Sequence, residues 1–286
     1  MSFGGVTPNQ IKRVAARIFD AAGINQIGFV LQKQFLSPFI RAVNYHDVAP
    51  EQAAGFERQL QFYARHYVSV DENDLRAFLQ TGAWPHAKPG LILTFDDGLP
   101  SHYFVVAPLL EKYNFTGWFF VPANQIDFAL EKPGGEEKPE SIRSNYQSTG
   151  LTVAQLKNLA ARQVIGSHTK SHARLSESLT SEQFQTEIVH SRDFIERLLE
   201  RDISIFAWVG GEENSYSRWG AELIKKTYNL SFMTNSCVIR PSADPHQIQR
   251  TNIEADNPLW FVRFQLSGLM DLLYANKRRR VNRLTS

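Results

Sequence analysis

The alternation of apolar and polar positions between residues 41 and 265 predicts strands separated by helices. Six short apolar runs are expected to be strands: RAVNYH (41–46), LILTF (91–95), GWFFVP (117–122), QVIGSH (163–168), SIFAWV (204–209) and LSFMTNS (230–236). Strands that are apolar on both faces and alternate with helices indicate a parallel sheet covered by helices. Six or seven such units favour a closed barrel over an open sheet, although periodicity by itself does not decide between the two.

Two of the intervening segments begin with the signature of a helix start. Thr152 is followed by Gln155, and Thr180 is followed by Gln183. Each pair fits a capping box, in which the two side chains bond to each other's backbone amides. Apolar residues then recur at helical spacing, so we expect a helix after each capping box.

One segment interrupts this alternation. Residues 131–141 read EKPGGEEKPES and are rich in proline, glycine and charge, so they cannot form part of a core. We expect a surface loop here, inserted in the main domain near residues 127–150. The apolar periodicity on both sides belongs to one series, which argues against a linker between two domains.

Residues 1–40 are expected to form a helical extension that precedes a single domain over residues 41–286. Thr7 and Gln10 frame another capping box, and apolar residues follow at helical spacing: Ile11, Val14, Ala15, Ile18 and Phe19. We expect this helix to pack on the main domain. The alternative is a face for a membrane surface or a partner protein.

The C-terminal end carries a run of basic residues: Lys277, Arg278, Arg279, Arg280 and Arg283. A run of this kind is typical of a solvated tail. No aromatic residues are interleaved with it, so we expect no nucleic-acid partner.

Composition narrows the class of protein. The 286 residues carry a formal net charge of +2, so the total charge implies no strongly basic or acidic partner. Cys237 is the single cysteine, which excludes an intramolecular disulfide and a cysteine-rich zinc site. The N-terminus lacks the pattern of a signal peptide, and no segment is long and apolar enough to span a bilayer. We therefore expect a cytoplasmic protein.

Three polar clusters directly follow predicted strands. They are Asp96-Asp97-Gly98, the stretch IGSHTKSHARL (165–175) with His168 and His172, and FAWVGGEEN (206–214). Sites in parallel α/β folds gather at the C-terminal ends of the strands, so all three clusters lie where chemistry is expected.

Each cluster taken alone has a structural explanation, because Asp-Asp-Gly is a common turn and a histidine pair can be incidental. Together they supply one carboxylate and two imidazoles that can converge on a divalent cation. Such a set leaves coordination positions for water and substrate, as in catalytic sites. A cation would also offset the cost of placing Asp96 and Asp97 at the end of an apolar strand.

These motifs resemble those of a known family. TFDDG (94–98) followed by SHTKSH (167–172) is similar to the first two motifs of the NodB-like polysaccharide deacetylases, the fourth carbohydrate esterase family. VNYHDV (43–48) is similar to the opening strand of many members, and IFAWVGG (205–211) resembles the FAYPYG form of the third motif. The similarity covers roughly residues 41–265 and implies an α/β fold that is a distorted (β/α) barrel.

The resemblance also implies roles for individual residues. Asp97, His168 and His172 would hold a metal ion, and Asp96 would act as general base toward a water molecule. By position, the backbone N–H of Gly210 would donate to the developing oxyanion.

The remaining catalytic groups match the family less closely. Arg250 resembles an arginine that some relatives place near the catalytic aspartate, where its charge would keep Asp96 ionised. Many members supply a general acid from a late Leu-x-His motif, which this sequence lacks. His246 is the best-placed late histidine, and His46, at the end of the first predicted strand, is the second candidate.

The predicted function is that of a hydrolase, a metal-dependent deacetylase acting on an N-acetylated sugar in a poly- or oligosaccharide or its precursor. We expect the cofactor to be zinc, with cobalt, nickel or iron as alternatives. An amidase on another small amide and an inactive carbohydrate-binding barrel are the other readings of the sequence. A cytoplasmic precursor as substrate would suit work at the inner membrane surface, with peripheral membrane contact.

Overall fold

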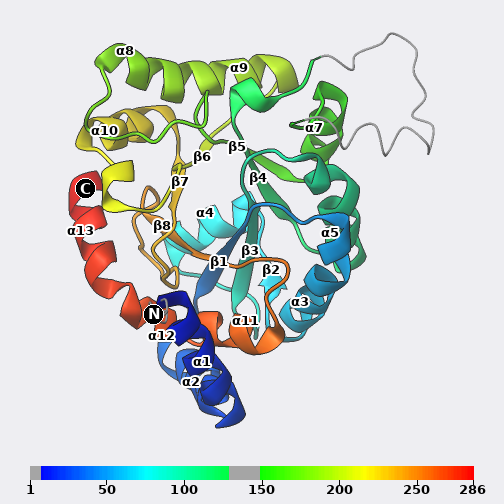
Figure 1. Cartoon of the computed structure of the whole chain (residues 1–286). Helices are drawn as coiled ribbons and strands as arrows, with labels where there is room; N and C mark the ends of the chain where they lie inside the picture. The colour runs from blue at the N-terminus through cyan, green and yellow to red at the C-terminus, as the bar shows by residue number, and fades with distance from the viewer. Residues whose placement is uncertain (1–7, 129–148) are drawn as a thin grey trace, which may run out of the picture.

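The computed structural model describes residues 8–128 and 149–286, with side chains described from Lys12 onward. A parallel sheet forms the centre of the molecule (Figure 1). In chain order its strands are β1 (Ile40–Tyr45), β2 (Val68–Ser69), β3 (Gly90–Phe95), β4 (Gly117–Val121), β5 (Val164–Ser167), β6 (Ile205–Ala207), β7 (Leu230–Met233) and β8 (Ile248–Asn252). Each of the six predicted runs overlaps a strand. The predicted loop at 131–141 and most of the predicted insertion lie outside the described residues.

The sheet closes into a barrel of seven strands in the order β1-β8-β7-β6-β5-β4-β3. The ring is completed by β3 and β1, which pair in parallel from Ile40 opposite Gly90 to Tyr45 opposite Phe95. The two-residue β2 pairs with the beginning of β3, so β1 closes directly against β3. The prediction of a distorted (β/α) barrel is confirmed, and the distortion lies at β2.

Helices surround the barrel, as Figure 1 shows. They are α3 (Ala53–His66), α4 (Glu72–Thr81), α5 (Ala107–Lys112), α7 (Val153–Ala160), α8 (Ser181–Phe184), α9 (His190–Leu199), α10 (Arg218–Thr227), α11 (Leu259–Leu266), α12 (Leu269–Leu273) and α13 (Ala275–Thr285). Both predicted capping boxes are confirmed, because Thr152 and Thr180 accept from the amides of Gln155 and Gln183. The third box involves Thr7, which lies outside the described residues.

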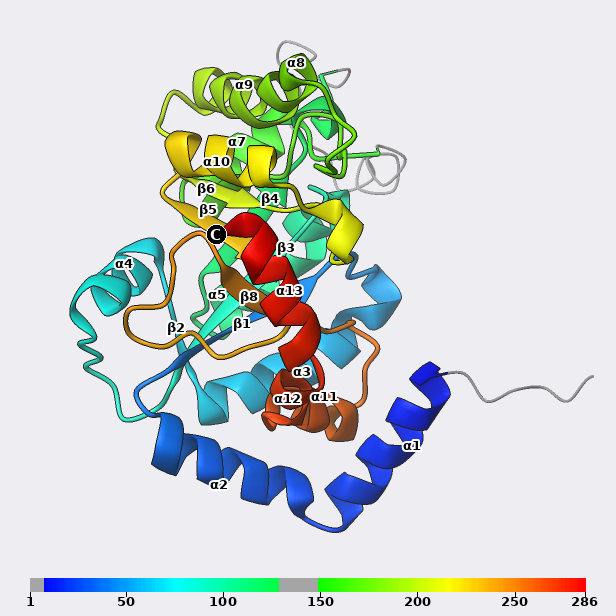
Figure 2. The ribbon, with the colours of Figure 1, turned by 90° about the vertical axis from the view of Figure 1, so that its left-hand side faces the viewer.

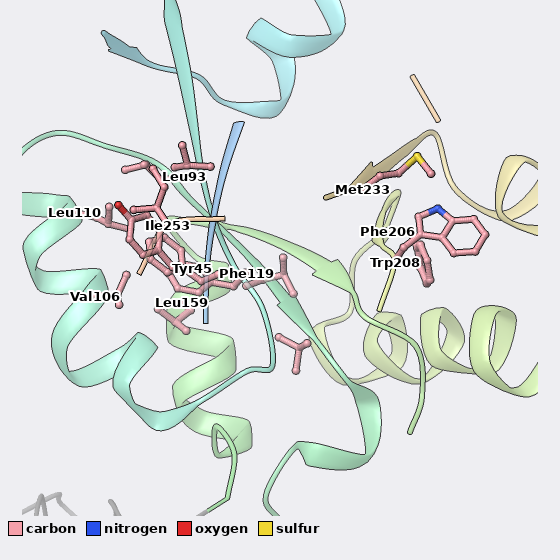
Figure 3. Packing of buried hydrophobic residues seen from close by; sticks show 14 of the residues in the cluster. Tyr45, Leu93, Val106, Leu110, Phe119, Leu159, Phe206, Trp208, Met233 and Ile253 are labelled. Atoms are coloured by element: carbon pink, nitrogen blue, oxygen red, sulfur yellow. The ribbon is translucent and has the colours of Figure 1, made fainter. Parts of the chain in front are cut away.

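The core has two layers. The outer layer lies between the strands and the helices, where Tyr45 and Phe119 pack with Leu110 of α5 and Leu159 of α7 (Figure 3). The inner layer fills the barrel with apolar side chains near the beginnings of the strands: Ile40, Ile92, Trp118, Ile205, Leu230 and Ile248. Toward the other ends of the strands the interior becomes polar, and this change of character positions the candidate site.

The N-terminal extension consists of α1 (Pro8–Ala21) and α2 (Ile24–Leu36). Ala16 of α1 packs with Phe264 of α11 and Met270 of α12, as expected for a helix that lies on the main domain. The main domain begins with β1 at Ile40, close to the predicted boundary.

The C-terminal basic run is not a solvated tail, and that expectation is wrong. Residues 275–285 form helix α13, which lies along the side of the barrel (Figure 2). Its Arg278 donates to the carbonyl oxygens of Asn235 and Ser236, and Val281 is fully buried. These contacts form because a helix turns Arg278 and Val281 toward the barrel. A count of the basic residues in the sequence did not reveal that arrangement.

Candidate active site

The polar part of the barrel interior begins with the side chains that follow Ile92 along β3. Side chains alternate between the two faces of a strand, so Thr94 and Asp96 point to the same side as Ile92, into the barrel. The amide of Asp96 still bonds to the carbonyl oxygen of Tyr45, which extends the pairing with β1 by one residue. Asp96 is therefore held by the sheet itself, with only 2 % of its surface exposed.

A buried arginine compensates the charge of Asp96. Arg250 on β8 donates to both carboxylate oxygens, from Nη1 to Oδ1 at 2.6 Å and from Nη2 to Oδ2 at 2.9 Å. Its Nη1 also lies within hydrogen-bond distance of Asn44 Oδ1 and Thr94 Oγ1. The structure thus places Arg250 where the resemblance to the family implied, and a bidentate pair of this kind fixes the orientation of the carboxylate.

The pairing decides the protonation state of Asp96. Burial acts to raise the pKa of its carboxyl group, but the charge of Arg250 and the nearby His168 act in the opposite direction and prevail. The pKa of Asp96 is therefore lowered, and the carboxylate is ionised at neutral pH.

Three side chains from two loops meet beside Asp96. One ligand atom from each of Asp97, His168 and His172 can be chosen so that all three atoms lie within 4.8 Å of one another. Asp97 Oδ1 is 3.0 Å from His172 Nε2 and 3.7 Å from His168 Nε2. Asp97 lies 71 and 75 positions before the two histidines in the sequence, and the ends of β3 and β5 bring them together.

The ring of His168 is oriented by the neighbouring strand. Its Nδ1 lies 2.8 Å from the carbonyl oxygen of Ala207, the last residue of β6. A carbonyl oxygen only accepts, so Nδ1 carries the proton and Nε2 presents a lone pair to Asp97. Burial lowers the pKa of His168, which favours this neutral form.

Glu187 holds the loop that carries His172. This buried carboxylate accepts from the amides of Lys170 and Ser171 at 2.9 and 2.8 Å, and from Ser171 Oγ at 2.7 Å. The sequence did not single out Glu187. Its signal was a carboxylate between Phe184 and Ile188, on the apolar face of the helix predicted after Thr180.

Backbone conformation at the cluster is unusual. Asp97, Thr169 and His172 have φ angles of 77°, 62° and 60°, in the left-handed region that non-glycine residues seldom occupy. In each case the conformation turns the chain sharply at the end of a strand or within the short loop that follows β5, which keeps the three side chains close.

The donor set fits a divalent cation. Asp97 Oδ1 is buried without an aligned hydrogen bond, although an imidazole nitrogen lies 3.0 Å away. Burial acts to raise the pKa of Asp97, but His172 and His168 lower it to about 2. One ionised carboxylate and two imidazoles match the nitrogen and oxygen ligands of catalytic zinc and related ions.

The cluster opens into a cavity of about 420 Å³. Asp96, His168 and His172 lie along one part of its lining, and His46 and Gly210 lie along others. Tyr274 and Lys277, at the beginning of α13, complete the wall. His46 is positioned through its backbone, because its carbonyl oxygen lies 2.9 Å from Nε2 of the fully buried His102.

Gly210 requires glycine for a conformational reason. Its φ angle is +82°, and a Cβ atom would lie 2.6 Å from Ser215 Oγ and 3.2 Å from Arg174 Nε. In the family that the sequence resembles, proline normally precedes this position, whereas this chain has Val209, which is buried. Arg174, on the cavity wall beside Gly210, was not predicted from the sequence.

His246 is not part of this cavity, which corrects its selection as a candidate acid. It precedes β8 and lies next to the beginning of β7, where Ser231 Oγ donates to its carbonyl oxygen. The candidate site lies at the opposite ends of these parallel strands. Position late in the sequence therefore did not indicate position in the barrel, and His46 is the candidate acid that the fold brings to the site.

The comparisons with known proteins agree with this geometry. The model of the polysaccharide deacetylase family matches residues 85–228, half of the chain, and this range includes Asp96, Asp97, His168 and His172. No curated protein matches the chain.

Several solved structures share the fold. The Streptococcus pyogenes deacetylase PplD, in complex with acetate, is 21 % identical, with a TM-score of 0.61 over 75 % of this chain and 92 % of that one. IcaB from Ammonifex degensii is 19 % identical, with a TM-score of 0.60 over 80 % and 97 %. The de-N-acetylase from Aggregatibacter actinomycetemcomitans is 16 % identical, with a TM-score of 0.62 over 80 % and 100 %.

At these identities the solved structures establish the barrel, and the family match establishes the relationship. The chain belongs to the polysaccharide deacetylase family, whose members are hydrolases that act on N-acetyl amide bonds.

Proposed function

We propose that this protein is a metal-dependent deacetylase that hydrolyses the acetamide of an N-acetylated sugar in a poly- or oligosaccharide or its precursor. The observation that carries the proposal is the convergence of Asp97, His168 and His172 beside an ionised Asp96, with Asp96 and both histidines lining one open cavity. In this proposal the first three residues hold the cation, for which zinc is the first candidate. The cation, when bound, acts as a Lewis acid and lowers the pKa of a water molecule that it binds.

The chain's own groups handle the proton and the charge. Asp96 accepts the proton of the attacking water, and Arg250 keeps its carboxylate ionised and correctly oriented. The backbone N–H of Gly210, on the cavity wall, donates to the oxygen that becomes negative. His46, on the same wall, returns a proton to the leaving amine.

Acetate release from N-acetylglucosamine oligosaccharides tests the proposal. The full chain loaded with zinc, cobalt or nickel should release acetate, and Asp96→Asn should lower kcat by roughly 10²–10⁴ while keeping the metal. His168→Ala should lose the metal as well. Asp202→Asn removes an exposed carboxylate far from the cavity and serves as the matched control.

Two results would count against the proposal. If no N-acetylated sugar yields acetate but another small amide is cleaved with the same dependence on Asp96, the protein is an amidase with a different substrate. If the metal and an oligosaccharide bind without turnover, the barrel is a carbohydrate-binding module. Nothing in a pure binding site calls for a buried, ionised Asp96, so its pairing with Arg250 favours turnover.

A further inference from the structure

The outer surface of α1 and α2 is unusually apolar. Most of the strongly exposed large apolar side chains in the described part of the chain lie on these two helices, with 37–68 % of their surfaces exposed: Val14, Ile18, Ile24, Ile27, Val30, Leu31 and Phe35. On α2, Ile27, Leu31 and Phe35 follow one another at intervals of four residues, so they form one stripe along the helix. Figure 2 shows both helices at the edge of the molecule, beneath α11 and α12.

The inner surface of α2 is mixed, because the partly buried Phe29 and Leu36 pack against the core beside two polar side chains. The helix therefore buries polar groups while it exposes large apolar side chains. Its buried residues are Asn25 and Gln32. Gln32 Nε2 donates to the carbonyl oxygen of Leu266 at 3.0 Å, and its Oε1 accepts from the fully buried Arg41. A helix on a water-soluble protein turns its apolar stripe inward and its polar side chains outward. In α2 large apolar side chains also point outward, which indicates that the outer face meets a medium other than water.

The charges on these helices are almost all positive. Asp20 is the single acidic residue between positions 8 and 36, and it is paired with Arg263 of α11. The same segment carries four basic residues, which outnumber this one paired carboxylate: Lys12, Arg13, Arg17 and Lys33. Two copies of the chain that met through this face about a two-fold axis would bring like charges together, which opposes self-association. Apolar side chains flanked by cations suit the surface of an anionic bilayer.

Neither helix has the dimensions of a membrane span. Among the described residues, no single helix is long and apolar enough to cross a bilayer. The segments Lys12–Ala21 and Ile24–Leu36 would qualify only together, and they are bent by 81° at the break between them. Two bent helices with outward apolar side chains have the form of an interfacial anchor.

We propose that the α1–α2 face docks on the surface of a bilayer that contains anionic lipid. The docking also bears on the site, because Lys12 and Arg13 of α1 line a cavity of about 360 Å³. This cavity shares Thr234, Asn252 and Tyr274 with the candidate active-site cavity. A docked protein therefore holds its reaction site beside the bilayer, which suits an N-acetylated sugar carried on a lipid. This last step rests on the proposed function, whereas the docking does not.

Co-sedimentation with vesicles tests the docking. The full chain should bind vesicles of phosphatidylcholine with phosphatidylglycerol, and Ile27→Ser/Leu31→Ser/Phe35→Ser should weaken binding by about tenfold or more. Trp219→Ser, which removes a 63 % exposed side chain from α10, should bind like the parent. Arg17→Gln/Lys33→Gln should weaken binding to the anionic vesicles roughly twentyfold. Sodium carbonate should release the bound protein.

Each other outcome overturns the proposal in a recognisable way. Equal binding by the parent and the triple serine variant would show that the α1–α2 face does not contact the membrane. Retention after carbonate treatment would show an integral segment. A dimer in sedimentation velocity that the triple variant abolishes would make the face an interface between copies. Thermal unfolding and acetate release from a water-soluble oligosaccharide should be unchanged in the triple variant, so failure of docking is separable from failure of the proposed activity.

Discussion

The candidate active site and the N-terminal extension both bury polar groups, but their surroundings differ. In the barrel, Asp96 and Arg250 form a buried ion pair whose other side opens into a cavity. In the extension, Gln32 is buried against Arg41, while the same helix exposes the apolar Leu31 and Phe35. The site concentrates polarity where a substrate enters, whereas the extension hides polarity and presents apolar surface.

Buried polar groups have different roles in the two regions. At the site the buried charges are fixed by partners so that Asp96 keeps one protonation state and one orientation. In the extension a buried amide and the partly buried Phe29 attach a helix to the main domain, and the apolar stripe of that helix stays exposed. Variants that remove a buried group in each region should therefore differ in what they damage.

The largest effect is expected from Arg250→Met, which leaves Asp96 buried without its cation. In the metal-free protein the free energy of unfolding at pH 8 should fall by about 3–5 kcal/mol. Without Arg250, burial dominates and raises the pKa of Asp96, so the folded variant binds a proton more readily than the unfolded chain does. The deficit should therefore shrink between pH 8 and pH 5, and urea unfolding in the presence of a chelator measures it.

The double variant Asp96→Leu/Arg250→Met provides the control for this prediction. It removes both charges and should recover most of the lost stability. A deficit that is the same at pH 5 and pH 8, or that persists in the double variant, would show that Arg250 acts through packing.

Glu187→Gln should weaken the metal site and leave Asp96 intact. The loop with His172 would lose the carboxylate that accepts from the amides of Lys170 and Ser171. Metal affinity should fall about 10- to 100-fold, as measured by competition with a chromophoric chelator. Glu182→Gln, an exposed change in α8, should bind metal like the parent. Equal affinity in both variants would show that the loop is held by other contacts.

In the extension, Gln32→Leu should lower the free energy of unfolding by about 1–3 kcal/mol, because Arg41 and the carbonyl oxygen of Leu266 lose a partner. Metal affinity and kcat should not change. Gln34→Leu, an exposed change on the same helix, should have little effect in a urea titration. A stability gain from Gln32→Leu would refute the polar attachment of α2.

The smallest effect on stability is expected from Phe35→Gln. The side chain is 68 % exposed, so the free energy of unfolding should change by no more than about 0.5 kcal/mol. Differential scanning calorimetry measures this, and a clear loss would mean that Phe35 packs against the protein. Together with Gln32→Leu, this result would show that Gln32 helps to attach α2 and that Phe35 does not.

The strands were predictable where the interior is apolar. LILTF and GWFFV are buried on both faces, and their composition identified β3 and β4. The strand β8 reads IQRTN and was missed, because its buried Gln249 and Arg250 find their partners on other strands. The two-residue β2 is too short to have a pattern.

Site residues that belong to a sequence motif could be predicted. Site residues that only the fold brings to the cavity could not be predicted. The two motifs supplied Asp96, Asp97, His168 and His172, which the ends of β3 and β5 bring together. From the sequence His246 was ranked above His46, but only the direction of the strands shows which histidine reaches the cavity, and His46 lines it. The cytoplasmic location stays a prediction.

The left-handed backbone conformations at the candidate metal cluster have a consequence for the metal-free protein. Asp97 after β3, and Thr169 and His172 in the loop after β5, each store backbone strain of order 1 kcal/mol. A cation that bridges the side chains would help to hold that geometry, and its removal would let the peptide units relax. Proteases should therefore nick residues 168–173 faster after chelation, which makes limited digestion a simple gauge of loading.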